Sequence, residues 1–202
     1  MKKNSDVIRT MKQNYMRDSS YLFFENVSDK NLCQSNIAKF LGVNRSLINR
    51  NLLGDSQIEL WEVIVLYDLG IADLTPCLLP GCTPYSKNGK QLNATIKSHT
   101  YFFKNNCSFE KRKSEQPNLK KAINDLLSDR LVYEMNNRNL SCCQLLNILN
   151  NSTCDKTGHS SIEIIDFSLI DKYTKKERNI QPWFIRSIYH TQKINLIDSL
   201  FK

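Results

Sequence analysis

The chain has 202 residues, of which 41% are hydrophobic and 24% charged, with six glycines and five prolines. This composition excludes collagen-like, low-complexity and wholly disordered chains, and the length suffices for a buried core in one large or two small domains. The 28 Lys and Arg residues exceed the 20 Asp and Glu residues, and the net charge of +8 favours a polyanionic partner such as nucleic acid.

Membrane-spanning and secretory segments are not expected. Glu62 and Asp68 interrupt the most apolar stretch, residues 60–69, so no run approaches the roughly 18 apolar residues of a transmembrane helix. The N-terminus begins with basic residues but lacks the apolar core of a secretory signal. Seven cysteines at irregular spacing fit a reducing compartment better than a disulfide framework. We therefore expect a cytoplasmic protein that does not contact a membrane.

The spacing of apolar residues predicts a mainly α-helical chain. Helices are expected over 6–16 and 20–27, and then as a pair of short helices within 33–54. In the C-terminal half, one helix is expected over 119–135 with Asn118 as its cap, and another over 142–149 with Ser141 as its cap. A third opens with the capping box at 160–163 and reaches Leu169, and a fourth begins at Pro182. Residues 92–103 are the one stretch that could form a strand.

Two stretches suggest boundaries between domains. Prolines and glycines gather between residues 75 and 89, and a charged segment ends in proline at 111–117. These boundaries predict an N-terminal unit over 1–80, a basic linker over 81–117 and a helical unit over 118–202.

The most informative segment lies between Cys33 and Gly54. Six positions there have the character that two short helices crossing over a tight turn require, with a small residue at the crossing, a glycine at the turn and apolar residues facing inward: Ile37, Ala38, Leu41, Gly42, Val43 and Ile48. Asn44 is placed to cap the second helix. The segment therefore predicts a helix–turn–helix unit.

This pattern resembles the helix-turn-helix of the lambda-repressor/Cro-like (XRE) DNA-binding domains over roughly residues 20–75. The segment from Gly54 to Trp61 resembles the loop that follows in that family, and the segment from Val63 to Ile71 resembles its next helix. One departure is Asn51, which stands where the family usually has an apolar residue. The resemblance implies a mainly α fold with an N-terminal lambda-repressor-like domain and a helical C-terminal region.

The resemblance also implies that the helix Asn44–Leu52 enters the major groove of DNA. Arginine can recognise guanine and asparagine adenine, and helix N-termini commonly contact phosphates. The residues expected to bind DNA on these grounds are Gln34, Asn44, Arg45, Ser46, Asn49 and Arg50. Lys30 and Lys39 are expected to contact the DNA backbone, because residues 30–53 contain four basic residues and no acidic one.

Most of the excess positive charge lies elsewhere, in residues 81–122, which contain nine basic and two acidic residues. We expect Lys111, Arg112 and Lys113 to add non-specific contacts with the DNA backbone. The alternative is that this stretch is a solvated linker.

Together these features predict a transcriptional regulator that binds double-stranded DNA, as a homodimer on a palindromic operator. The C-terminal region would serve dimerisation or contact another regulatory protein. Two alternatives are a DNA-binding replication, partition or conjugation factor of a mobile element, and an adaptor that binds protein instead of DNA.

Other chemical signals are weak. Cys77 and Cys82 have a spacing compatible with zinc, but no second pair of ligands lies at a compact spacing. Glycine-rich phosphate loops and the sequence signatures of common hydrolases are absent. Residues 180–188 resemble the second helix of another helix-turn-helix, although Trp183 and Phe184 suit a core or a dimer contact better. We therefore expect no catalytic residues, no cofactor and no metal.

Overall fold

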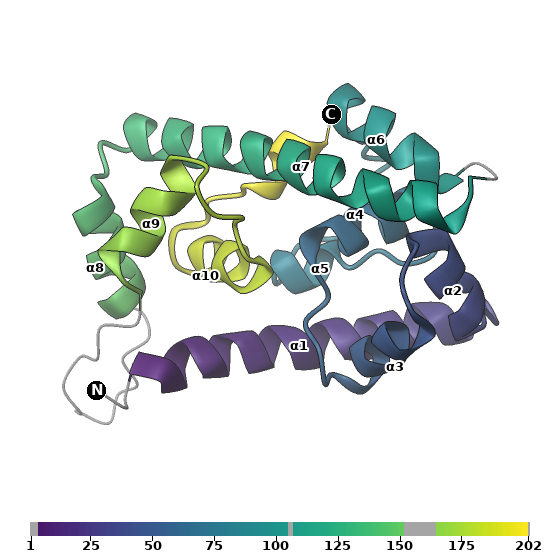
Figure 1. Ribbon diagram of the computed structural model, residues 1–202. Coiled ribbons are helices and arrows are strands. Elements are labelled where there is room, and N and C mark those ends of the chain that lie inside the picture. Colours follow the sequence, from purple (N-terminus) through teal and green to yellow (C-terminus); the bar gives the residue numbers. More distant parts are fainter. Residues whose placement is uncertain (1–3, 105–106, 152–164, 202) are drawn as a thin grey trace.

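Two long helices frame the molecule in the computed structural model, which describes residues 4–104, 107–151 and 165–201. Helix α1 (Asn4–Asp29) and helix α7 (Phe109–Asn137) run along opposite sides (Figure 1). Three helices fill the space between them: α4 (Leu60–Asp68), α5 (Thr75–Leu78) and α10 (Pro182–Gln192).

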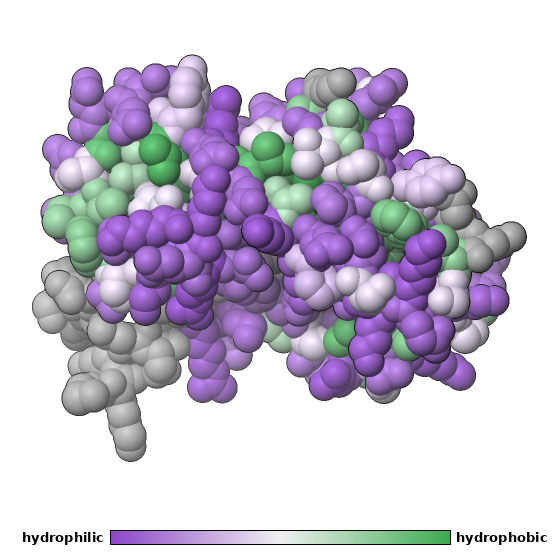
Figure 2. Space-filling view, turned by 45° about the horizontal axis from the view of Figure 1, so that its top comes forward, coloured by the Kyte–Doolittle hydropathy of each residue, from purple (hydrophilic) through white to green (hydrophobic). Residues whose placement is uncertain are grey.

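The remaining elements lie at the ends and along α7. One end of the molecule carries α2 (Gln34–Leu41) and α3 (Arg45–Leu53), and the other end carries α8 (Cys142–Asn151) and α9 (Phe167–Thr174) (Figure 1). Helix α6 (Ala94–Lys104) and the short 3-10 helix η1 (Ile197–Leu200) pack against α7. The face that carries α7 is covered mostly by hydrophilic side chains (Figure 2).

The mainly α-helical prediction is confirmed. In the part of the chain that the structure describes, the β-structure consists of one isolated bridge between Leu92 and Phe201. Ser141 caps α8, because its hydroxyl accepts a hydrogen bond from the backbone N–H of Gln144 at 3.2 Å. Pro182 occupies the first turn of α10 as expected. None of the helices in these ranges is long and apolar enough to cross a membrane.

One prediction differs from the structure, because the two expected N-terminal helices are one continuous helix, α1. Most of the stretch 92–103, which could have formed a strand, belongs to α6, and the side chain of Asn93 accepts a hydrogen bond from the backbone N–H of Thr95 at the start of this helix. The capping box at 160–163 lies outside the described residues, and α9 begins later, with Asp166 as its N-cap.

The three predicted domains also differ from the structure, because one continuous hydrophobic core extends from Tyr15 to Phe201. Trp183 and Phe184 belong to this core. Arg186 of α10 forms an ion pair with Asp18 of α1 at 2.6 Å, which joins the two ends of the chain. The N-terminal and C-terminal parts therefore fold as one packed body.

Helix α7 replaces the predicted boundary at residue 117. It begins after Ser108, whose hydroxyl accepts a hydrogen bond from the backbone N–H of Lys111 at 3.3 Å, and it continues through Pro117 for another 20 residues. A proline in a helix removes one backbone hydrogen bond. Contacts with α2 offset this loss, since the side-chain amide of Gln116 donates to the carbonyl oxygens of Leu41 and Gly42 at 3.0 and 3.1 Å.

Candidate nucleic-acid interface

Helices α2 and α3 form a compact pair joined by a turn at Gly42. Ile37, Ala38 and Leu41 of α2 are buried, and Ile48 anchors α3 in the same core. Gly42 ends α2 in the left-handed region with a φ of 66°, which glycine adopts at little cost. The local geometry therefore matches the predicted pair of helices and its turn.

Gly42 is also constrained by α7. A Cβ atom at this position would lie 2.9 Å from Cβ of Arg112 and 3.2 Å from the backbone nitrogen of Lys113. Such short contacts would force one of the two segments to move. The start of α7 therefore rests directly on the turn between α2 and α3.

The structure gathers the residues predicted to bind DNA on one exposed side of α2 and α3. Asn44 is the N-cap of α3, although its side chain forms no capping hydrogen bond. The amide of Gln34, at the start of α2, lies 3.4 Å from Oδ1 of Asn49 on α3. All six predicted residues are exposed or partly exposed: Gln34, Asn44, Arg45, Ser46, Asn49 and Arg50.

The opposite side of α3 is held by a polar side chain. Asn51 is 1% exposed, and its side-chain amide lies 3.4 Å from Oε1 of Glu62 on α4. The hydroxyl of Ser56 donates to Oδ1 of Asn51. Glu62 accepts a second hydrogen bond at Oε2, from the backbone N–H of Glu59 at 2.7 Å. Burial raises the pKa of Glu62 to about 7.

This contact gives a polar residue a partner at a buried position of α3. The carboxyl group of Glu62 on α4 faces the amide of Asn51, so Asn51 is buried with a hydrogen-bonding group beside it. The signal available in the sequence was Glu62 at the third position of α4, where a capping box forms with Glu59. Its link to Asn51 could not be predicted from local spacing.

The two predicted backbone contacts near this pair of helices, Lys30 and Lys39, are both exposed, and Lys30 also forms contacts within the protein. The ammonium group of Lys30 donates hydrogen bonds to the carbonyl oxygens of Gly70 and Ile71, the latter at 2.8 Å. These carbonyl groups follow the C-terminal end of α4, where a positive charge is favourable. Lys30 therefore helps to hold the end of α4, and its expected phosphate contact stays a prediction.

The basic segment at the start of α7, residues 111–113, contains one buried and two exposed side chains. Arg112 is only 4% exposed, and its Nη1 donates a hydrogen bond to the carbonyl oxygen of Lys39 at 2.6 Å. Its guanidinium group also lies 5.9 Å from the ring centroid of Phe40. We therefore withdraw Arg112 from the expected phosphate contacts, because this side chain is used to pack α7 on α2.

The neighbours of Arg112 remain exposed. Lys111 lies with its ammonium group 5.3 Å from the ring centroid of Phe102, and Lys113 is exposed beside the turn at Gly42. Helix α7 thus places Lys113 beside the α2–α3 pair and Lys111 against α6, so this segment is part of the folded body and not a solvated linker. The sequence indicated the positive charge of this segment but not the helix that carries it.

In the part of the chain that the structure describes, no group of three or more His, Cys, Asp and Glu residues that could hold a metal ion occurs. The described cysteines are free thiols. Cys77 is buried, which raises its pKa to about 12, and Sγ of Cys82 lies 2.8 Å from the hydroxyl of Tyr189.

Comparisons with protein-family models, with curated proteins and with solved structures found no match.

Proposed function

We propose that the protein is a cytoplasmic transcriptional regulator that binds double-stranded DNA with sequence specificity. Helix α3 would enter the major groove, as in the lambda-repressor/Cro-like domains that residues 20–75 resemble. A homodimer would place two copies of α3 about one helical turn apart on a palindromic operator.

The observation that carries this proposal is the exposed face of α3. Arg45, Asn49 and Arg50 lie on this face and can donate hydrogen bonds to base edges. Ile48 and Asn51 fix the opposite face, so the helix is held rigidly by its neighbours. A protein that recognises a DNA sequence needs both an exposed polar face and a fixed opposite face, because base recognition depends on side chains that project from a firmly placed backbone.

Local charge supports the same proposal. Residues 30–53 contain no acidic residue, Lys39 and Lys113 are exposed near the turn at Gly42, and Lys111 is exposed beside Phe102 of α6. These lysines are placed to contact phosphates beside the groove that α3 would occupy. Sequence-specific and sequence-independent contacts would then come from adjacent parts of one rigid surface.

Selection from a pool of random duplexes, followed by fluorescence anisotropy, tests the proposal. We expect a preferred sequence to emerge, and we expect R45A and R50A each to reduce the affinity for it by about tenfold or more. R178A is the matched control, because Arg178 is exposed in the segment between α9 and α10, outside the α2–α3 pair.

Two outcomes of these binding measurements would contradict the proposal. No binding of duplex DNA even at low salt would exclude both a regulator and a mobile-element assembly factor, and would leave a protein-binding adaptor. Specific binding that R45A and R50A leave unchanged would show that α3 is not the recognition helix. Mapping the selected sequence to promoters would distinguish a regulator from an assembly factor.

A further inference from the structure

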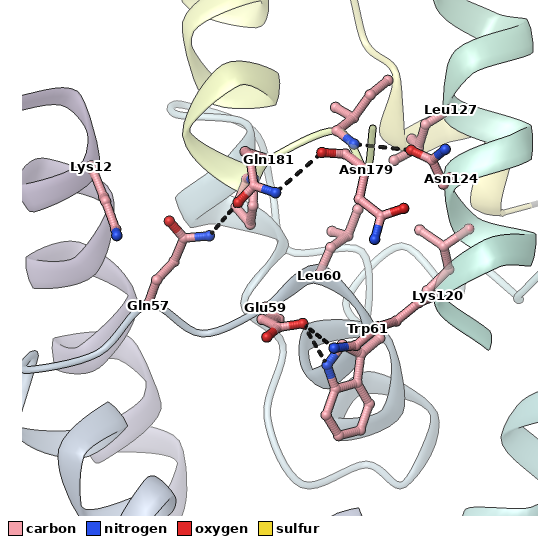
Figure 3. Close-up of a pocket in the computed structure, with 13 residues that line it drawn as sticks. Lys12, Gln57, Glu59, Leu60, Trp61, Lys120, Asn124, Leu127, Asn179 and Gln181 are labelled. Carbon is pink, nitrogen blue, oxygen red and sulfur yellow. Dashed lines mark hydrogen bonds and ion pairs between the residues drawn. The ribbon is translucent and has the colours of Figure 1, made fainter. Parts of the chain in front are cut away.

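A cavity of about 420 Å³ lies away from the α2–α3 turn, where four parts of the chain meet (Figure 3). The loop before α4 and the start of α4 form one wall, α7 forms the facing wall, the start of α10 closes a third side, and Lys12 of α1 lies at the edge. This volume is within the range of small-molecule sites, about 300–1,000 Å³.

The apolar part of the cavity is formed by buried side chains. Its hydrophobic lining residues are each at least nine-tenths buried: Leu60, Trp61, Ile123, Leu127, Ile180 and Pro182. They come from elements far apart in the sequence, so the wall exists only in the folded chain. Because each of these side chains exposes less than a tenth of its surface, together they form a small apolar floor, on which one face of a hydrocarbon or aromatic group could rest.

Most polar groups around the cavity are already paired with one another. The amide of Gln57 donates to the side chain of Gln181 at 3.2 Å, and the amide of Gln181 donates to the carbonyl oxygen of Asn179 at 3.1 Å. On the α4 side, Oε2 of Glu59 accepts a hydrogen bond from the indole of Trp61 at 3.0 Å. The same oxygen lies 2.6 Å from the ammonium group of Lys120.

Two polar side chains of the lining remain available. Within the described ranges, the ammonium group of Lys12 has no hydrogen-bond or ion-pair partner, and neither does the side-chain amide of Asn179. Because Lys120 offsets the charge of Glu59, the cavity has an excess of one positive charge, at Lys12. An anionic group would be attracted to this edge, while a cation would be repelled.

We propose that this cavity binds a small organic anion, with its carboxylate or phosphate group at Lys12 and its apolar body against Leu60, Trp61 and Ile123. The combination of one uncompensated ammonium group and a small apolar floor selects for a molecule with these two parts. The proposal stands independently of DNA binding, since the cavity shares no residue with the exposed face of α3.

The indole N–H of Trp61 gives a direct readout, because it lines the cavity and the chain has only two tryptophans. Two-dimensional ¹H–¹⁵N spectra show one indole signal for each tryptophan, and the variant W183F assigns them. The probes are 3-phenylpropionate, phenyl phosphate and the neutral 3-phenylpropionamide. We expect at least one anion to shift the Trp61 signal saturably, and the amide to bind about tenfold more weakly.

Substitutions test the role of Lys12. K12Q is expected to weaken binding of the anion about tenfold and to leave binding of the amide unchanged. K121Q is the matched control, because Lys121 is exposed on α7 next to Lys120 and does not line the cavity. The proposal is wrong if neither anion shifts the Trp61 signal at about 10 mM, if anion and amide bind equally, or if K121Q weakens binding as much as K12Q does.

Discussion

Arg112 of α7 donates a hydrogen bond to the carbonyl oxygen of Lys39 on α2 at 2.6 Å, and this contact joins the middle of the chain to the candidate DNA-binding surface. The guanidinium group is buried, so its removal leaves a carbonyl group without its donor. We expect R112A to lower the free energy of unfolding by about 2–3 kcal/mol, measured by urea denaturation. A loss below about 0.5 kcal/mol would show that the contact does not hold α7 in place.

The two lysines beside Arg112 are expected to act on DNA affinity instead of stability. Lys111 and Lys113 are exposed, so K111Q/K113Q should leave the free energy of unfolding unchanged within about 0.5 kcal/mol. Each phosphate contact contributes about 0.9 to the slope of log affinity against log salt concentration. The double variant should therefore flatten this slope by about 2 and preserve the preferred sequence.

Anisotropy titrations at several salt concentrations measure that slope. K121Q supplies a control for the loss of an exposed lysine on α7, since Lys121 lies outside the segment that packs on α2. An unchanged slope in K111Q/K113Q would remove α7 from the DNA interface. A changed sequence preference would mean that these lysines contact bases.

Gly42 allows a separate test of the contact between α7 and the turn. An alanine at this position has an unfavourable positive φ, and its Cβ would also meet Cβ of Arg112 at 2.9 Å. Gly89 has a similar φ of 64°, but nothing lies within 4 Å of an added Cβ. We expect G89A to lower the free energy of unfolding by about 1 kcal/mol through backbone strain alone, and G42A to lower it by at least twice that amount. Equal losses would show that α7 yields easily.

The pKa of Glu62 predicts how stability depends on pH. Burial raises this pKa from its ordinary value of 4.5 to about 7, so the folded state binds the proton more tightly than the unfolded state. This contribution is fully present below pH 4.5 and is lost as the pH rises through 7. With about 1.4 kcal/mol for each pH unit of difference in pKa, Glu62 should reduce the free energy of unfolding by about 3 kcal/mol between these limits.

Denaturation of the E62Q variant isolates this group from the others that titrate in the same range. We expect the difference between E62Q and the unchanged protein to shift in favour of E62Q as the pH rises from 5 to 8, because the variant cannot ionise. A difference that stays constant over this range would show that Glu62 keeps an ordinary pKa, and that the bonds from Asn51 and Glu59 stabilise its charge sufficiently.

The pair α2–α3 was predictable because its signals are local. The periodicity of Ile37, Leu41 and Ile48 defines the buried side, and Gly42 marks the turn through a conformation that few other residues adopt. The continuity of α1 was not predicted, since the pattern indicated separate helices over 6–16 and 20–27. In the structure Ser19 and Ser20 at this junction are buried, and their hydroxyls donate to the carbonyl oxygens of Met16 and Arg17.

The role of α7 was not predictable for a different reason. A run of charged residues that ends in Pro117 favours a linker when only neighbouring residues are considered. Arg112 and Gln116 form hydrogen bonds with the carbonyl oxygens of residues more than 70 positions earlier, and these contacts hold the helix together across the proline. The residues that neighbour Arg112 and Gln116 in the sequence do not indicate these distant partners. The same limit applies to Lys30, whose carbonyl partners lie 40 residues away.

Cys33 offers a chemical probe of the candidate interface. It is the N-cap of α2 and is exposed, and its sulfur lies 3.2 Å from the hydroxyl of Ser35, which lowers the pKa of the Cys33 thiol. Cys77 is buried, and its pKa is raised to about 12. Because the thiolate is the reactive form, iodoacetamide at pH 7.5 should alkylate Cys33 much faster than Cys77. Peptide mass spectrometry over time measures both rates in one sample.

Two further measurements connect this reactivity to structure and function. S35A removes the hydrogen bond to the sulfur and should slow alkylation of Cys33 without changing that of Cys77. Under the proposed function, the selected duplex should also protect Cys33, because the next residue, Gln34, is expected to contact a phosphate at the start of α2. Cys143 is exposed on α8, at the other end of the molecule, so its alkylation should be unaffected by DNA. Equal protection of Cys33 and Cys143 would contradict binding at α2 and α3.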